Sequence, residues 1–241
     1  MEAGAIALIA GVCFLGSLVQ AACGFGFAVV VMGVLYALMP TFGEAAGLSN
    51  LLMLCVSAAF MLRLRGHIRW RVILWPLAAY LPVSFLMVRI VAADPNGLMQ
   101  KLLGAGLVGL GVYMIFFQGR LHIRMTPVSG LITGALSGVL GGLFCMAGVP
   151  MAVYLLSVEE KEDYLATIQT FFAMVAVYSA VLHGASGFLT GRVFQAFLFS
   201  LAAVALGAAA GKRIFNRINR ETLKKVVYGF MLVSGVFLLA S

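Results

Sequence analysis

The sequence contains few charged residues. Aspartate, glutamate, lysine and arginine make up 10% of its 241 residues, whereas 63% are hydrophobic and the mean hydropathy is +1.09. So little polar surface excludes a water-soluble domain of this length. The apolar segments are long and continuous, which excludes a membrane barrel of alternating strands of roughly ten residues each. We therefore expect an all-α polytopic protein that crosses the inner membrane of a bacterium several times.

Residues that bind metals or form disulfides are also scarce. The four cysteines all lie inside apolar runs, which argues against a disulfide framework. The three histidines, His67, His122 and His183, do not have zinc-type spacing. We expect no metal, no cofactor and no catalytic residue, and hence a protein that is not an enzyme. The net charge of +8 does not indicate nucleic acid, because the basic residues adjoin apolar runs and there set membrane orientation.

The first apolar run, from about Ala5 to Met39, is too long for one ordinary span. As a straight helix its 35 residues would extend roughly 50 Å, against a hydrocarbon core of roughly 30 Å. Gly24 and Gly26 flank Phe25 and permit backbone angles that a helix interior excludes. We expect the helix to break between Cys23 and Gly26. Broken backbone at membrane depth needs protein or a water-filled cavity to satisfy its polar groups, so this break is a candidate substrate site.

The same feature occurs twice, 122 residues apart. The corresponding pairs are Gly16 and Gly138, Cys23 and Cys145, and Gly26 and Gly148. The second run, about Pro127 to Ser157, is again too long for one span and is broken between Gly141 and Pro150. We expect two repeated units, residues 1–118 and 127–241, which form one integrated transport domain.

Charge placement predicts how the units cross the membrane. Besides the two broken runs, we expect spans at about 44–62, 72–93, 98–117, 164–183, 193–211 and 226–240. If each broken run crosses once, the basic loops 63–71 and 212–225 lie on opposite sides, against the positive-inside rule. If each is a hairpin that returns to its starting side, both loops and the basic segment 120–124 share one face. We therefore expect two inverted repeats, each a broken helical hairpin plus three transmembrane helices, with both termini outside.

The two breaks resemble those of the sulfite exporter TauE/SafE family of membrane transporters. The matching segments are Gln20-Ala-Ala-Cys-Gly-Phe-Gly-Phe27, Gly138 to Pro150, Gly66-His-Ile-Arg-Trp70, Leu206 to Gly211, and Leu223-Lys-Lys225 leading to Leu232-Val-Ser-Gly-Val236. The resemblance covers nearly the whole chain. It implies export of sulfite, sulfoacetate or another sulfur-containing or organic anion. The second break departs from the glycine-rich pattern of the family at Cys145, Ala147 and Val149.

An anion inside the membrane needs charge compensation, and a helix N-terminus supplies about half a positive charge. We expect the two breaks to provide two such ends, assisted by neutral side chains at similar depth. Gln20 precedes the first break, while Asn50 and the pair Gln169 and Thr170 occupy similar places in the two units. The alternative for these residues is hydrogen bonding between helices. The expected substrate-binding residues are Gln20, Cys23, Gly24, Phe25, Gly26, Asn50, Phe144, Cys145, Met146, Gly148, Gln169 and Thr170.

Several functions are compatible with the sequence. Our leading hypothesis is a secondary transporter that moves a small anion outward by alternating access. One alternative is a passive anion channel through the same pore. The other is a membrane-embedded enzyme or thiol relay that uses Cys23 and Cys145. The expected partners are the anion and the lipid bilayer; a coupling proton or ion and a homodimer are also compatible with the sequence, and nucleic acid is not expected.

Two charged residues within or beside the spans have local explanations. Arg89 is close to Asp94 and to the membrane edge, where snorkelling or pairing is expected rather than substrate contact. Glu44 is a candidate carrier of a coupling proton, although the helix dipole alone accounts for an acidic residue at a helix start.

Overall fold

The computed structural model describes residues 3–92 and 123–215, with isolated positions between 101 and 112 and at 232 and 236. Regular structure in this part of the chain is helical. The long helices are α1 (Ala3–Cys23), α3 (Phe42–Arg63), α4 (Trp70–Ala92), α6 (Pro127–Phe144), α8 (Lys161–Ala185) and α9 (Gly191–Phe215). The short ones are α2 (Phe27–Leu38), α7 (Gly148–Tyr154) and the 3₁₀ turns η1 (Arg65–His67) and η2 (Leu155–Ser157).

Four of the expected spans are confirmed by α3, α4, α8 and α9. The spans expected near 98–117 and 226–240 lie largely outside the described residues. Helix α8 begins within the acidic segment 159–163, at Lys161. Glu162 and Asp163 therefore lie in the first turn of that helix, where carboxylates interact favourably with the helix dipole.

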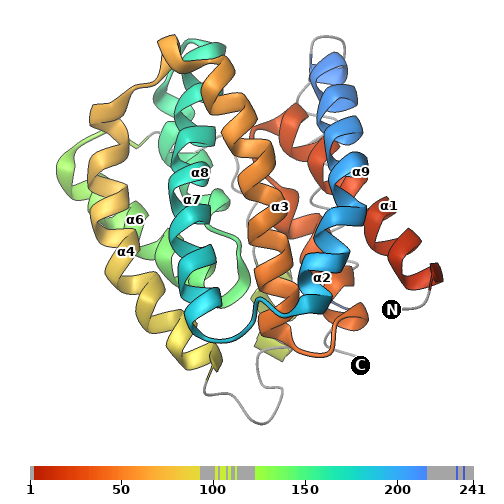
Figure 1. Cartoon of the computed structure of the whole chain (residues 1–241). Coiled ribbons are helices and arrows are strands. Elements are labelled where there is room, and N and C mark those ends of the chain that lie inside the picture. Colours follow the sequence, from red (N-terminus) through yellow and green to blue (C-terminus); the bar gives the residue numbers. More distant parts are fainter. Residues whose placement is uncertain are drawn as a thin grey trace.

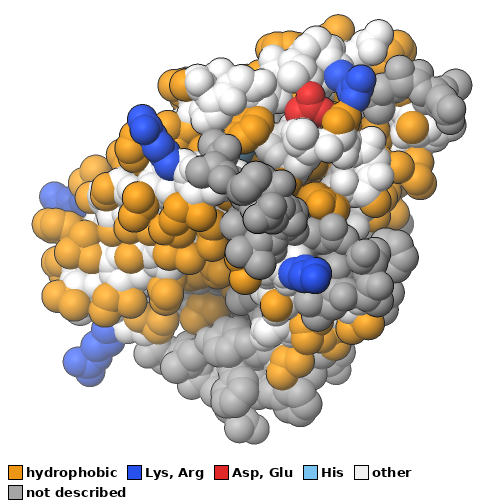
Figure 2. All heavy atoms as spheres, turned by 90° about the horizontal axis from the view of Figure 1, so that it is seen from below, with side chains coloured by type: hydrophobic (Ala, Val, Ile, Leu, Met, Phe, Trp, Pro, Cys, Tyr) orange, Lys and Arg blue, Asp and Glu red, His pale blue; other side chains and the backbone are white. Residues whose placement is uncertain are grey.

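The chain is a multi-pass integral membrane protein. Six of its described helices are long and apolar enough to cross a membrane. Their outer surfaces carry large exposed hydrophobic side chains, among them Trp75, Phe85, Leu136, Phe199 and Leu206. Figure 2, which views the molecule from below, shows hydrophobic side chains gathered on the left of the described surface, with few charged ones among them. Such a surface is suited to lipid rather than to water.

The helices pair in a crossed pattern between the two halves of the chain (Figure 1). The central pair is α3 and α8, one from each half. On one side of this pair α1 packs against α9, and on the other side α6 packs against α4. The first helix of each hairpin, α1 or α6, therefore packs against a long helix of the other half, so neither half has its full set of contacts alone.

Both broken runs are hairpins. In the first, Gly16 of α1 faces Val31 of α2, and the backbone N of Phe27 lies 3.2 Å from the side-chain oxygen of Gln20. In the second, a Cβ on Gly130 would lie 3.3 Å from the Tyr154 hydroxyl, and a Cβ on Gly141 would lie 3.0 Å from Ala147. In each hairpin, residues farther from the turn in one helix meet residues farther from the turn in the other. Helix α2 therefore runs back along α1, and α7 runs back along α6. This confirms the hairpin prediction.

The hairpin arrangement places most described basic residues at one end of the bundle, which we call the basic face. Contacts between Gly207 and Phe14 and between Gly211 and Leu18 make α9 parallel to α1, and α6 is likewise parallel to α4. The basic face therefore holds Arg63, Arg65, Arg69, Arg71, Arg124, Lys161, Lys212 and Arg213. The other end, which we call the Phe188 face, holds the α2–α3 and α8–α9 connections. By the positive-inside rule we expect the basic face to be cytoplasmic.

Cysteine labelling tests this topology. Ser186 in the α8–α9 connection and Gly66 in the α3–α4 connection are both exposed, and they lie on opposite faces. We expect an impermeant thiol reagent to label Ser186→Cys in intact cells, and to label Gly66→Cys only after the membrane is permeabilised. Labelling of both variants in intact cells would contradict the hairpin topology.

Candidate functional site

The first break consists of three residues between α1 and α2. Gly24 has φ +84° and Gly26 has φ +110°, both in the left-handed region that glycine adopts without strain. Gly26 is the N-cap of α2 and has no side chain to cap it. Gln20, six residues before Gly26, caps the helix instead, because its side-chain oxygen accepts a hydrogen bond from the Phe27 N–H. The predicted break between Cys23 and Gly26 is confirmed.

The second break is narrower than the predicted segment from Gly141 to Pro150. Helix α6 continues to Phe144, and only Cys145, Met146 and Ala147 separate it from α7. Cys145 has φ +61°, and hydrogen bonds from its N–H and from that of Met146 to the carbonyls of Gly141 and Leu140 close the helix end. Cys145 thus occupies the left-handed position that Gly24 occupies in the first break. The 122-residue spacing in the sequence paired Cys145 with Cys23, which is one residue before Gly24.

The two hairpin turns meet in a buried pocket in the middle of the bundle. A Cβ on Gly148 would lie 3.2 Å from the Cβ of Phe25 and 2.8 Å from the ring of Phe172, so the turns are in close contact there. The pocket is lined by Gln20, Phe25, Gly26, Phe27, Ala28, Val29, Met53, Cys145, Met146, Gly148, Val149 and Phe172. About 10 Å³ is open to the centre of a water-sized molecule, roughly enough for a single water. The lining contains no charged side chain.

Gln20 is the centre of a buried hydrogen-bond network beside the pocket. Its side-chain nitrogen donates to the Ser57 hydroxyl at 3.0 Å and to the side-chain oxygen of Gln169 at 3.3 Å. Gln169 in turn donates to the backbone oxygen of Gly24 at 3.3 Å. The first hairpin turn is therefore attached to α3 through Ser57 and to α8 through Gln169.

The second hairpin turn is attached to α3 by a smaller set of contacts. The Asn50 side-chain nitrogen lies 3.3 Å from the Cys145 sulfur and 3.0 Å from the backbone oxygen of Ala46. Thr170 makes the corresponding contact within α8, donating to the backbone oxygen of Ala166 at 2.7 Å. Asn50 thus holds the turn of the other half of the chain, as Gln169 does.

The N-terminus of α2 opens into the pocket. The N–H groups of Ala28 and Val29 have no hydrogen-bond acceptor in the described part of the chain, while that of Phe27 is paired with Gln20. Unpaired first-turn N–H groups and the helix dipole favour an anion. The second expected anion-binding end is the N-terminus of α7. Helix α7 has only seven residues, whereas α2 has twelve.

The structure brings half of the expected binding residues to the pocket wall: Gln20, Phe25, Gly26, Cys145, Met146 and Gly148. Gly24, Asn50 and Gln169 lie one contact away, through hydrogen bonds to lining residues or to their neighbours. Cys23, Phe144 and Thr170 are not in the lining. Sequence reasoning missed Met53, Ser57 and Phe172. Helical spacing could have found them, since they follow Asn50 and Gln169 by three or seven residues on the same helix faces.

The cysteines form no disulfide. Of the four, Cys13 and Cys145 are buried. Within the described residues there is no group of three histidine, cysteine or acidic side chains able to hold a metal ion. Arg89 is exposed, and its guanidinium lies 4.8 Å from the centre of the Phe85 ring, outside the pocket.

Comparisons with known proteins agree with this architecture. A family model described as "Sulfite exporter TauE/SafE" matches residues 8–238. The chain is 24% identical over 230 residues to a protein of Cupriavidus necator named "Probable sulfite/organosulfonate exporter TauE", with 93% of this chain and 90% of that protein covered. No solved structure matches the chain.

Proposed function

The chain belongs to the sulfite exporter TauE/SafE family, and we propose that it exports a small sulfur-containing or organic anion, such as sulfite or an organosulfonate, by alternating access. The pocket between the two hairpin turns carries this proposal. It is buried in the membrane domain, it lies where two breaks in helical backbone meet, and it has unpaired backbone donors without a fixed charge. The name of the relative from Cupriavidus necator supports the substrate class.

The anion is held by helix ends and neutral donors in this proposal. The Ala28 and Val29 N–H groups lie at the positive end of α2 and have no competing acceptor in the described part of the chain. The Gln20 and Asn50 amides lie at the two hairpin turns and supply further donors. This arrangement avoids the cost of burying a permanent cation at membrane depth.

We further propose that the two halves are inverted repeats around this pocket. The crossed pairing of α1 with α9 and of α6 with α4 supports this, because a twofold axis between α3 and α8 exchanges the two pairs. The first hairpin enters from the Phe188 face and the second from the basic face. An anion reaches the pocket from each side in turn when the hairpin turn of one half separates from the central pair α3 and α8.

The pocket must widen during transport. It has room for about one water, and sulfite has four non-hydrogen atoms. The hydrogen bonds between the hairpin turns and Asn50, Ser57 and Gln169 are the contacts that change when the pocket opens, since they connect the turns to the central helices.

A binding titration on folded, membrane-inserted variants tests the proposed site. We expect Gln20→Leu and Asn50→Leu each to weaken sulfite or organosulfonate binding by about 1 to 3 kcal/mol, roughly ten- to hundredfold, because each leaves buried polar groups unpaired. Arg89→Gln is the control and should bind almost normally, since Arg89 is exposed and outside the pocket.

Two results would contradict the proposal. If Arg89→Gln abolishes binding while both leucine variants bind normally, the anion site lies at the membrane edge instead. If vesicles containing the wild-type protein take up the anion at a rate that rises linearly without saturation, the protein is a passive channel.

A further inference from the structure

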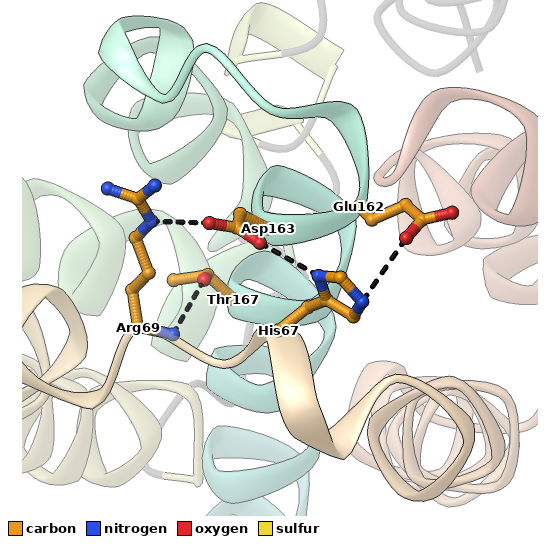
Figure 3. Close-up of polar contacts among 5 residues, drawn as sticks. All are labelled: His67, Arg69, Glu162, Asp163 and Thr167. Carbon is orange, nitrogen blue, oxygen red and sulfur yellow. Dashed lines mark hydrogen bonds and ion pairs between the residues drawn. The ribbon is translucent and has the colours of Figure 1, made fainter.

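Each face of the central helix pair is closed by a connection that contacts the start of the facing helix. On the basic face, the α3–α4 connection reaches the first turns of α8 (Figure 3). Asp163 Oδ2 lies 2.7 Å from Arg69 Nε, and Asp163 Oδ1 lies 3.0 Å from His67 Nδ1. His67 Nε2 also lies 3.2 Å from Glu162, and the Arg69 N–H donates to the Thr167 hydroxyl at 3.1 Å. We call this set of contacts the basic-face clamp.

The Phe188 face carries the equivalent contacts in the other half. There the α8–α9 connection reaches the first turns of α3, with the Phe188 ring against Gly43 and Leu189 against Gly47. The Thr190 hydroxyl donates to Glu44 Oε1 at 2.9 Å. We call these contacts the Phe188-face clamp. Asp163 follows Glu44 by 119 residues, the same spacing as between Asn50 and Gln169, so the two carboxylates occupy corresponding positions.

The two carboxylates differ in how their charge is compensated. Asp163 is 18% exposed and has a guanidinium and an imidazole beside it. Glu44 is 9% exposed. Within the described part of the chain, the only partner of its side chain is the neutral Thr190 hydroxyl, and its second oxygen Oε2 is buried without any hydrogen-bond partner. Burying a carboxylate oxygen without a partner is costly unless the group is neutralised.

The charged and titratable groups on the elements around Glu44 do not pair with it. His183 at the end of α8 is buried and its Nδ1 lies 2.7 Å from the backbone oxygen of Ser179. Arg192 in the first turn of α9 is exposed, and Tyr36 of α2 packs against Phe42. Within the described part of the chain, Glu44 forms no ion pair.

We propose that Glu44 is the binding site of a coupling proton, which enters from the Phe188 face and drives anion export. This inference rests on the proposed transport function and adds its coupling ion. A proton from the outside neutralises the carboxylate and so removes the cost of burying it in the closed clamp, where Thr190 still donates to Oε1. Loss of that proton leaves a charge in a buried site without a cation, which opens the clamp and releases the α8–α9 connection.

The position of Glu44 links this proton to the anion pocket. Glu44 lies two residues before Ala46, whose backbone oxygen accepts from Asn50, and Asn50 contacts Cys145 in the second hairpin turn. A change at the start of α3 therefore acts within about two helical turns of the contact that holds that hairpin.

Proton movement in lipid vesicles tests the inference. A pH-sensitive dye inside the vesicles reports protons, and exchange of labelled sulfite at equal pH on both sides reports anion transport alone. We expect Glu44→Gln to retain sulfite exchange and to lose both the proton movement and the acceleration by a pH gradient. The glutamine is nearly isosteric and keeps an oxygen for Thr190. The matched control is Glu159→Gln, which removes an exposed carboxylate and should behave as the wild type.

A second measurement needs no transport. Infrared difference spectra of the protein in lipid, recorded on acidification, should show a protonated carboxyl band in the wild type and in Glu159→Gln that is missing from Glu44→Gln. Retention of that band in Glu44→Gln, or sulfite-driven proton movement at the wild-type level in Glu44→Gln, overturns the inference. If the wild type exchanges sulfite without any proton movement, the proton inference is also overturned, but the proposed anion export stands. If the wild type exchanges neither sulfite nor organosulfonates, the proposed function itself is overturned.

Discussion

Gly26→Val is expected to abolish anion transport while most of the protein remains folded. Gly26 has φ +110° and ends the first break immediately before α2. A side chain in the left-handed region costs about 1 to 2 kcal/mol, and a β-branched one is especially unfavourable there. Relief of this strain by rotation of φ moves the Phe27 N–H away from Gln20 and the start of α2 out of the pocket.

The measurement is sulfite flux in vesicles together with the elution profile of the detergent-solubilised protein. Gly11→Val in α1 is the matched control, because a Cβ at Gly11 meets nothing within 4 Å. We expect this variant to transport at the wild-type rate. Normal transport by Gly26→Val would mean that the left-handed conformation at this residue is not needed for function.

Gly134→Val is expected to prevent accumulation of folded protein, the largest effect on stability that we predict. A Cβ on Gly134 would lie 2.7 Å from the carbonyl carbon of Pro76 and would overlap the carbonyl oxygen. These are backbone atoms of α4, so the clash is relieved only if α4 and α6 separate. Overpacking typically costs about 1 to 3 kcal/mol where side chains can adjust, and here they cannot. Small residues that let two backbones approach are typical of membrane helix pairs.

The readout for this variant is the amount of monodisperse protein after solubilisation and its thermal unfolding midpoint. Gly134→Ala should already lower the midpoint, since the clash involves the Cβ atom alone. Gly11→Val, again in open space, should leave yield and midpoint unchanged. A Gly134→Val protein as stable as the wild type would show that α4 and α6 pack less closely than described.

Features that depend on local properties of the sequence were predictable, whereas features that depend on contacts between distant residues were not. The break at Gly24 and Gly26 was predictable because the excess length of a single run and the glycine content are local properties of the sequence. The hairpin topology was predictable because the distribution of arginine and lysine along the chain has only one arrangement that places the basic loops on one face. Neither inference requires knowing which helices touch.

The contacts inside the pocket were not predictable in this way. Gln20 and Gln169 are 149 residues apart, and Asn50 and Cys145 are 95 apart, so each pairing depends on how α1, α3, α6 and α8 pack. The sequence indicated that these polar residues lie at similar depth, but not that each central helix holds the hairpin turn of the other half. The second break also proved narrower than its glycine and proline content indicated, because α6 continues to Phe144 and Cys145 itself adopts the left-handed conformation.

By itself, the sequence determined that this chain lies in the membrane, where its helices break and which end of the bundle is basic, since hydropathy, glycine and charge act on a residue regardless of its distant neighbours. Only the tertiary structure decided that the two turns meet at one pocket, that Met53 and Phe172 complete its wall, and that Glu44 is buried without a cation while Asp163 is paired. Those features depend on close packing between helices far apart in sequence, and burial and charge compensation exist only once the helices are assembled.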